Sequence, residues 1–334
     1  QTGINEVELY KKVSALIKEK NISLLVGIGN AISRHKTSFS HNSVFYYNTD
    51  DFIKTFNFSN LQNELILLKG ARIFNFEKIA EKLQFKTHET VLEINLNAIV
   101  NNYNYYKSKL QPKSKIMVML KAFGYGSGGV ELANVLQFHK ADYLGVAYAD
   151  EGVLLRKSGI TLPIMVMNPE TESYDYMIEY NLEPEIYSFR VLELFLNKLE
   201  KYSPNVSYPI HLKIDTGMHR LGFLESEIDS LLAKIKSASF IKVQSVFSHL
   251  AASDNPEQDD FTRKQIDLFQ IISNKIEQTL NYKVCKHILN TAAIARFPAA
   301  QFDMVRLGIG LHGISSINDE EKYLQAAATL KTTI

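Results

Sequence analysis

From about residue 113 onward, short apolar runs rich in β-branched residues alternate with longer segments whose apolar residues recur at helical spacing. Strands that alternate with helices are typical of repeated βα units around a parallel sheet. Eight units predict a closed (β/α)8 TIM barrel, which is an α/β fold, with a doubly wound open sheet as the alternative. The predicted strands are 115–121, 142–149, 162–168, 182–187, 209–215, 241–249, 284–290 and 303–308.

The segment before the barrel follows a different pattern. Residues 1 to about 88 predict a small α/β, Rossmann-like module, and the polar stretch 84–90 is the best candidate for a linker. We therefore expect two domains, 1–88 and 89–334. The predicted elements of the module are a helix over 8–20, strands over 23–29, 43–49 and 64–70, and a helix between the last two strands.

Two features at the edges of these domains have no place in the barrel pattern. The strand-like run TVLEINL, 90–96, precedes the eight strands and has no position among them. The chain opens on QTGINEVELY without an initiator methionine and stops at ATLKTTI after a helical pattern. We interpret both ends as cut.

Composition and charge argue against several classes of partner. The chain has 37 lysine and arginine residues against 36 aspartate and glutamate residues, and no segment concentrates basic residues, so no nucleic-acid partner is expected. No apolar run approaches a membrane span and the start lacks a secretion-signal layout, so no membrane partner is expected. The single cysteine, Cys285, fits a reducing cytoplasm and is interpreted as a core residue; no metal site is predicted.

Polar residues gather where the predicted barrel strands end, and this rim carries the active site in (β/α)8 enzymes. Taken singly, a lysine at a strand end is usually solvated and a histidine is usually structural. Their number at one rim favours a site instead. The residues are Lys121, Lys213, Asp215, Arg220, His249, Asn290, Thr291, Arg306, Gly308 and Ile309.

The stretch VMLKAFGYGSGG ends an apolar run with Lys121 and continues with a tyrosine and four glycines. An amine held against Val118, Met119 and Leu120 loses solvation, which favours the neutral form that attacks a carbonyl in Schiff-base chemistry. Glycines let backbone N–H groups approach an anion, and the loops after strands seven and eight commonly bind phosphate. A reactive lysine and a phosphate cradle predict pyridoxal 5′-phosphate (PLP), although a class I aldolase shares the lysine.

Four segments resemble the signature motifs of alanine racemases, in the family's order over about residues 90–334. They are KAFGYGSG (121–128), KIDTGMHRLG (213–222), NTAAIARFP (290–298) and MVRLGIGLHG (304–313). The resemblance implies that Lys121 binds PLP covalently and acts as the base on one face of the substrate. It further implies that the phosphate is held by Tyr125, Thr291, Gly308 and Ile309.

The same resemblance implies roles for the other rim residues. Arg306 faces the pyridine nitrogen, Arg220 bonds the phenolic oxygen, and Lys213 is the position that is often carbamylated; His249 and Asn290 support this shell. An arginine cannot give up its proton, so at the ring nitrogen it limits the electron-sink form that feeds side reactions.

The sequence also departs from the family. Phe123 and Ser127 replace a usual asparagine and histidine, and His312 replaces a usual tyrosine. Racemisation needs two acid/base groups on opposite sides of the cofactor. In the family the second is a tyrosine from a C-terminal β domain of the partner subunit, and the chain stops where that domain begins. We therefore expect PLP binding with impaired or no racemisation, a doubtful homodimer, and an unpaired edge at 90–96.

The first module resembles the end of the C-terminal domain of UDP-N-acetylmuramoyl-tripeptide:D-alanyl-D-alanine ligases, through LLVGIGNAISRHKT and LLKGARIFNFEKIAEKL. No P-loop occurs, so no ligase activity is predicted, and Lys69 and Arg72 are expected in a solvated loop. The combination resembles a bifunctional ligase/racemase of bacterial peptidoglycan synthesis acting on L-alanine in the cytoplasm. Alternatives are a PLP-homeostasis barrel that does not racemise, a non-catalytic docking role, and a serine substrate.

Overall fold

The computed structural model describes residues 5–39, 42–61, 64–83, 90–202, 207–317 and 319–332. The chain divides into two compact units, Gln1–Glu89 and Thr90–Ile334, called here the first unit and the barrel unit. The predicted linker, 84–90, lies outside the described residues except for Thr90. In the described part of the chain, no helix combines the length and apolar character needed to cross a membrane.

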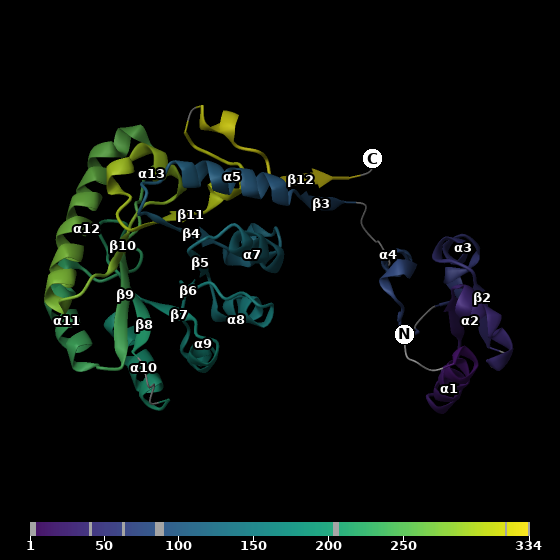
Figure 1. Ribbon diagram of the computed structural model, residues 1–334. Helices are drawn as coiled ribbons and strands as arrows, with labels where there is room; N and C mark the ends of the chain where they lie inside the picture. The colour runs from purple at the N-terminus through teal and green to yellow at the C-terminus, as the bar shows by residue number, and fades with distance from the viewer. Residues whose placement is uncertain are drawn as a thin grey trace. The chain divides into compact units, whose positions relative to one another are not determined.

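The first unit is a small α/β module, as the hydrophobic pattern predicts (Figure 1). Its two strands pair in parallel, with Gly27 opposite Phe45. Asn5 and Asn48 accept backbone hydrogen bonds at the starts of the first and third helices, which is the usual role of asparagine at a helix N-cap. Its elements are α1 (Glu6–Glu19), β1 (Leu25–Ile28), α2 (Asn30–Arg34), β2 (Ser43–Tyr46), α3 (Thr49–Thr55) and α4 (Glu77–Leu83).

The prediction of a strand over 64–70 in this unit is wrong. Residues 64–70, ELILLKG, have no regular structure, and the exposed fractions of Leu65 and Leu67 are 102% and 83%. A strand exists only when its backbone groups pair with a neighbouring strand, and no strand described in this unit pairs with this run. Lys69 is exposed in this irregular segment.

The barrel unit contains eight parallel strands, one in each predicted run. Their order is β10-β9-β8-β7-β6-β5-β4-β11, and two backbone hydrogen bonds join the ends of this sequence. Arg306 N donates to Leu289 O and Asp303 N donates to Lys286 O, each at 3.0 Å. The predicted (β/α)8 barrel is therefore confirmed, and the open sheet is excluded.

The strands of the barrel are short, and helices surround them (Figure 1). The strands are β4 (Lys115–Met119), β5 (Tyr143–Val146), β6 (Ile164–Val166), β7 (Glu183–Ile186), β8 (Tyr208–Lys213), β9 (Ile241–Phe247), β10 (Cys285–His287) and β11 (Met304–Leu307). The helices are α5 (Leu96–Ser108), α6 (Lys121–Tyr125), α7 (Gly129–Phe138), α8 (Ala149–Lys157), α9 (Tyr174–Glu179), α10 (Phe189–Glu200), α11 (Ile228–Ser237), α12 (Asp259–Leu280) and α13 (Thr291–Arg296).

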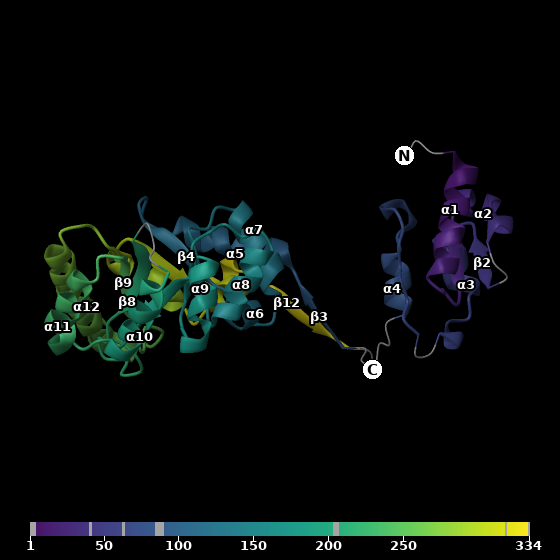
Figure 2. The same ribbon diagram turned by 90° about the horizontal axis from the view of Figure 1, so that it is seen from below.

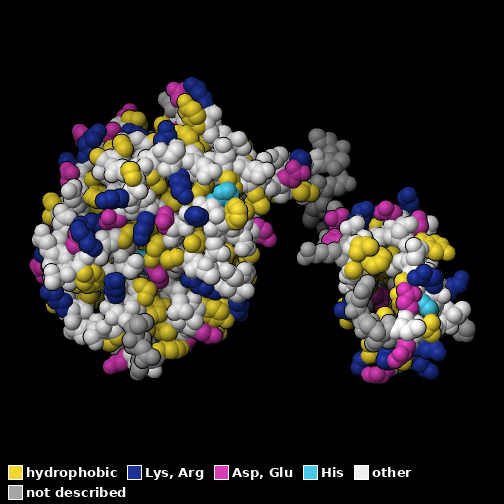
Figure 3. Space-filling model, in the orientation of Figure 1, with side chains coloured by type: hydrophobic (Ala, Val, Ile, Leu, Met, Phe, Trp, Pro, Cys, Tyr) yellow, Lys and Arg dark blue, Asp and Glu magenta, His cyan; other side chains and the backbone are white. Residues whose placement is uncertain are grey.

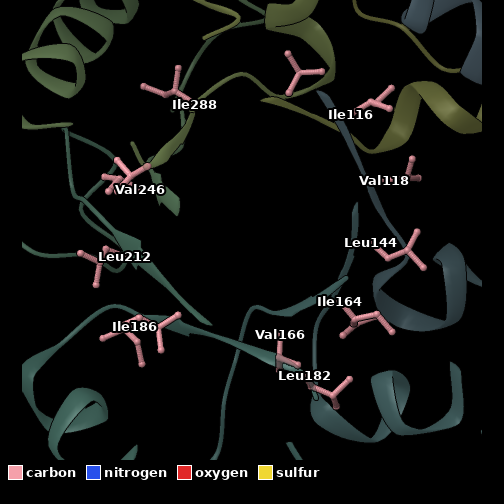
Figure 4. Close-up of a cluster of buried hydrophobic side chains, with 14 of the residues drawn as sticks. Ile116, Val118, Leu144, Ile164, Val166, Leu182, Ile186, Leu212, Val246 and Ile288 are labelled. Carbon is pink, nitrogen blue, oxygen red and sulfur yellow. The ribbon is translucent and has the colours of Figure 1, made fainter. Parts of the chain in front are cut away.

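The alternation of side chains along each strand separates two cores. Residues such as Ile116, Leu144 and Leu212 belong to the larger core between strands and helices, and Figure 4 shows them around the ring of strands. The intervening positions form a second cluster, to which Met117 and Phe247 belong and against which Cys285 packs, as predicted for a core cysteine. Burial raises the pKa of the Cys285 thiol to about 12.

The run TVLEINL is paired along one edge, and in the described part of the chain no strand pairs with its other edge, so the expected open edge remains on that side. It forms β3 (Val91–Ile94), which pairs antiparallel with β12 (Ala328–Lys331), and Figure 2 shows the two strands extending together from the barrel. The predicted C-terminal helical pattern is also wrong, because within the described residues 319–332 the helical structure is limited to the 3-10 turn Glu320–Tyr323. Pairing with β3 overrides the helix propensity of the alanines at this end.

Charged side chains are interspersed by sign on the faces drawn in Figure 3, as the near-zero net charge suggests. The loop after β8 returns tightly on the strand at Gly222, whose φ is +128°. A Cβ at this position would lie 2.6 Å from Asp215 N and 2.7 Å from the carbonyl carbon of Ile214. These are backbone atoms, which cannot rotate away as a flexible side chain can.

We predict that Gly222→Ala lowers the free energy of unfolding by about 2–4 kcal/mol, because the strained φ and the backbone clash add. Gly159 is the matched control: its φ is +89°, but a Cβ there meets nothing within 4 Å. Gly159→Ala should therefore cost only about 1 kcal/mol. Urea unfolding followed by near-ultraviolet circular dichroism measures both, and equal losses would contradict the role of the Gly222 contact.

Candidate active site

Barrel closure brings three loops together at the C-terminal rim. Strand β11 lies between β10 and β4, with Leu307 opposite Val118. The residues that follow these strands are Thr291 after β10, Gly308 after β11 and Lys121 after β4. Because the strands are parallel, these three residues start neighbouring loops on one side of the barrel.

Two hydroxyl groups and two backbone amides converge where these loops meet. Thr291 is buried, and its Oγ1 accepts hydrogen bonds from Gly308 N at 3.0 Å and Gly310 N at 3.5 Å. A Cβ built on Gly308 would lie 3.2 Å from the Tyr125 hydroxyl and 3.8 Å from Thr291 Oγ1. Glycine at 308 therefore leaves open a small space faced by two hydroxyl groups, which can donate hydrogen bonds to a phosphate group. Ile309 follows directly and is half exposed.

Lys121 stands beside this cradle at the start of α6. Its Nζ lies 5.8 Å from the centre of the Tyr125 ring, and its side chain is exposed. The expectation that Val118, Met119 and Leu120 desolvate the amine is therefore wrong: these residues are buried in the cores, and the lysine turns outward. A cofactor or substrate would have to provide the desolvation.

The turn that carries Lys121 has an unusual backbone. Ala122, Phe123 and Tyr125 all have φ between 52° and 57°, a left-handed conformation that side chains rarely adopt. Buried Glu151 holds the turn, because its Oε1 accepts a hydrogen bond from Phe123 N at 3.1 Å and its Oε2 accepts one from Ala147 N at 2.7 Å. Strain of this kind persists only where the surroundings enforce it, and it concentrates at functional sites.

Arg306 is buried in the barrel interior and is held by five acceptors. Its guanidinium donates to the carbonyl oxygens of His287, Ser248 and Ile288 at 3.3, 2.6 and 3.1 Å. It also lies 2.7 Å from His287 Nδ1 and 3.3 Å from His249 Nδ1. Burial lowers the pKa of Arg306 to about 10, against the attraction of Glu185, so the group stays charged at neutral pH.

The two histidines next to Arg306 are neutral. Arginine has no acceptor, so both Nδ1 atoms must accept and each ring carries its proton on Nε2. Burial, followed by the nearby cations Arg306 and Arg220, lowers the pKa of His249 to about 3. Burial and Arg306 likewise hold the pKa of His287 well below its usual range.

Lys213 forms a buried ion pair with Glu185, with 2.9 Å between Nζ and Oε1. Burial lowers the pKa of Lys213 and raises that of Glu185, opposing the attraction between them. The contact is an ion pair without hydrogen-bond alignment. The Lys213 Nζ and the Arg306 guanidinium each lie 5.3 Å from the centre of the Phe247 ring, so both cations share one wall of the barrel interior.

Arg220 and Asn290 have more peripheral positions. Arg220 is exposed on the loop after β8. Its positive charge acts to lower the pKa values of Glu185, Lys213 and His249. Burial alone would raise the pKa of Asp215, but hydrogen bonds from the backbone of Gly217 and His219 lower it and shape this loop. Asn290 caps α13 by accepting from Ala293 N, so it fixes the helix that begins with Thr291.

Sequence reasoning missed Glu185 and His287 on barrel strands β7 and β10, and Glu151 on helix α8. The signal available for the first two is the period of two along a strand. Glu185 lies two residues from Glu183, and Lys213 lies two from His211, so each pair points to the same interior face. The rule that catalytic residues follow barrel strands does not select Glu185 and His287, because both lie within the predicted strands 182–187 and 284–290.

The residues fit PLP on the evidence of the structure itself. The open space at Gly308 accepts a phosphate, the exposed Lys121 amine accepts an aldehyde, and the fixed Arg306 charge suits a ring nitrogen. Fold and site together define a (β/α)8 barrel of the class that binds PLP at the C-terminal ends of its strands.

Comparison with known proteins places the chain within this class. Residues 94–316 match the family model described as "Alanine racemase, N-terminal domain". The chain is 36% identical over 226 residues to alanine racemase 1 of Oceanobacillus iheyensis, covering 67% of this chain and 59% of that protein. It is 34% identical over 256 residues to the alanine racemase of Methanococcus maripaludis, covering 74% and 67% of the two chains.

Solved structures agree with this result. The alanine racemase of Clostridium difficile 630 in complex with cycloserine superposes with a TM-score of 0.68 at 31% identity, over 74% of this chain and 68% of that one. The chain belongs to the alanine racemase N-terminal domain family, whose members depend on PLP. It spans about three fifths to two thirds of the length of these relatives.

The neutral state of His249 predicts a pH dependence of stability. The folded state keeps this ring unprotonated down to about pH 3, whereas the unfolded chain binds a proton below about pH 6.5. The contribution of His249 to the free energy of unfolding is therefore complete above pH 6.5. As the pH falls toward 3, the free energy of unfolding decreases by up to about 1.4 kcal/mol per pH unit.

We predict that His249→Gln, which keeps an acceptor for Arg306 but does not titrate, flattens this dependence in the cofactor-free chain. Urea unfolding between pH 7 and 4.5 measures the slope, with His139→Gln as a control outside the site. The same slope in the wild-type and His249→Gln proteins would show that His249 is not held neutral.

Proposed function

We propose that this protein interconverts L- and D-alanine with PLP as cofactor. The observation that carries the proposal is the convergence of the Lys121 amine, the cradle of Tyr125, Thr291 and Gly308, and the Arg306 charge on one barrel rim. Membership of the family supports it. The relatives named above are alanine racemases, which favours alanine over serine as the substrate.

Different residues of the chain bind the cofactor and transfer the proton. Lys121 Nζ binds the cofactor and moves a proton to or from the α-carbon on one face of the substrate. The hydroxyls of Tyr125 and Thr291 and the backbone amides of Gly308 and Ile309 hold the phosphate. When bound, PLP supplies the electron sink that makes the α-proton removable.

Arg306 and its neighbours set the electrostatics of the site. Arg306 keeps its proton at neutral pH and donates to the ring nitrogen, so it limits the electron withdrawal that leads to side reactions. Arg220 is proposed to bond the phenolic oxygen of the cofactor. His249, neutral and bonded to Arg306, and Asn290, at the cap of α13, keep these groups in place.

Lys213 is proposed as a site of carbamylation. This modification needs a neutral amine, and burial lowers the pKa of Lys213. A carbamate would face Glu185, but burial also raises the pKa of that carboxyl, and its protonated form can donate to the new group. Incubation with ¹³C-bicarbonate should give a carbamate carbon signal in the wild-type protein and none in Lys213→Met; no signal in either removes the proposal.

The first unit is proposed to be the end of a ligase C-terminal domain, in a fusion that serves peptidoglycan synthesis in the cytoplasm. The support is its resemblance to such ligases in the segments 24–37 and 67–83. The parallel pair β1–β2 followed by α3 is compatible with this origin. Transfer of an added D-alanyl-D-alanine dipeptide by the isolated chain is not expected, and detecting it would contradict this assignment.

We predict that Lys121→Ala abolishes PLP binding through a covalent bond and any racemisation, because Lys121 supplies the amine that lies against Tyr125, one of the cradle residues. Absorbance of the PLP-loaded protein before and after borohydride reduction, with peptide mapping, measures the bond. Lys236→Ala, a change of an exposed lysine on α11, is the control and should leave both properties unchanged. Retention of the reduced adduct in Lys121→Ala would exclude Lys121 as the attachment site.

We further propose that residues 1–334 alone racemise slowly. Racemisation needs a second acid/base group on the opposite face. Tyr125 is not a candidate for that group, because its hydroxyl lies beside Gly308 and Thr291, where it is proposed to serve the phosphate. Loss of one acid/base group costs on the order of 10²–10⁴-fold in rate.

The measurement is conversion of L-alanine by the PLP-loaded chain, beside the alanine racemase of Oceanobacillus iheyensis under the same conditions. A rate lower by about 10²-fold or more is expected. A comparable rate would mean that this chain contains both acid/base groups, and would overturn the impairment while leaving the racemase assignment intact.

A further inference from the structure

A continuous row of hydrogen bonds crosses the barrel interior from Arg306 on β11 to Glu183 on β7. Arg306 Nη1 lies 2.7 Å from His287 Nδ1, and His287 Nε2 lies 2.9 Å from Ser245 Oγ. Ser245 Oγ lies 2.6 Å from His211 Nδ1, and His211 Nε2 lies 2.7 Å from Glu183 Oε2. We call these five residues the interior row.

The directions of the hydrogen bonds in the interior row are set by its two ends, Arg306 and Glu183. Arginine only donates, so His287 accepts at Nδ1 and carries its proton on Nε2. His287 therefore donates to Ser245, and the Ser245 hydroxyl donates to His211 Nδ1. At the other end the Glu183 carboxylate only accepts, so the His211 proton is on Nε2 and is donated to it. Each proton is used once, and all donors point toward the carboxylate.

The surroundings hold this arrangement in place. His211, Ser245 and His287 are completely buried, where an unpaired polar group is costly. The ring of His287 stacks on Phe247, with centroids 5.0 Å apart and 4° between the planes. At the far end, Tyr143 donates a second hydrogen bond to Glu183 Oε2 at 2.6 Å.

The row matters to the site because it ends on Arg306. A protonated His287 would have no lone pair for the guanidinium and would bring a second cation beside it. Burial and Arg306 keep the pKa of His287 far below neutrality, which agrees with the acceptor role. A buried hydrogen-bonded network is costly when one of its members loses its partner. Loss of the Glu183 carboxylate should therefore also weaken the hydrogen bond between His287 and Arg306.

We propose that Glu183 is a positioning residue for Arg306, acting through His211, Ser245 and His287. The carboxylate fixes the tautomer of His211 and completes the row that holds the His287 ring as an acceptor for the guanidinium. Only the consequence for cofactor binding rests on the proposed function. The tautomers are a property of the chain itself, so they can be tested without PLP.

The first test is ¹⁵N NMR of the cofactor-free chain labelled in histidine. The His211 and His287 signals are identified by contacts to the rings of Tyr143 and Phe247, which lie against them. We expect both rings to be neutral at pH 7, with a protonated Nε2 and an unprotonated Nδ1. A doubly protonated His211, or a proton on Nδ1 of either ring, overturns the proposal.

The second test compares variants of the terminal acceptor. Glu183→Leu removes it, Glu183→Gln keeps an oxygen that can accept from His211, and Tyr143→Phe removes the other hydrogen bond to the same carboxylate without cutting the row. We expect the His211 proton to move to Nδ1 in Glu183→Leu alone. PLP affinity should fall about tenfold in Glu183→Leu and stay near wild type in the other two variants.

The positioning role is contradicted if the His211 tautomer is unchanged in Glu183→Leu. It is also contradicted if Glu183→Leu and Glu183→Gln bind PLP with equal affinity. If Glu183→Leu does not fold by circular dichroism, Ser245→Ala cuts the same row at its centre and should give the same loss of PLP affinity. A wild-type chain that binds no PLP contradicts the proposed function, whereas the tautomer measurement still decides the proposal for Glu183.

Discussion

Closure of the barrel between β10 and β11 is the constraint on which the candidate site depends. In an open sheet, β10 and β11 would lie at opposite edges, and Thr291, after β10, would lie far from Gly308 and Lys121, which follow β11 and its neighbour β4. The hydrogen bonds from Arg306 N and Asp303 N join these edges. The same two bonds therefore complete the fold and assemble the proposed phosphate cradle.

The barrel interior carries more charge than an ordinary core, and its pairing explains how it stays folded. Arg306, Lys213 and Glu185 are all buried, and each has a charged or polar neighbour within the interior. Burial, followed by the nearby cations, keeps His249 and His287 neutral, which frees their Nδ1 atoms to accept from Arg306. In the barrel interior, burial and charge together therefore determine the protonation state of the two histidines.

The site combines a rigid half with an exposed half. Arg306 and its neighbours are fixed by buried hydrogen bonds before any ligand arrives, which lowers the cost of ordering them on binding. Lys121 and Tyr125 lie on a strained turn at the surface and remain accessible. A cofactor entering from the rim would meet a reactive amine above a charge that cannot move away.

The sequence by itself determined the eight barrel strands, the order of the motifs and the residues of the rim, because hydrophobic period and strand-end chemistry are local properties. It could not determine whether 64–70 or 328–331 forms a strand, since that depends on a partner elsewhere in the chain. Nor could it pair Glu185 with Lys213, or Glu183 with His211. These partners lie 28 residues apart in sequence and meet only because parallel neighbours β7 and β8 bring them into register.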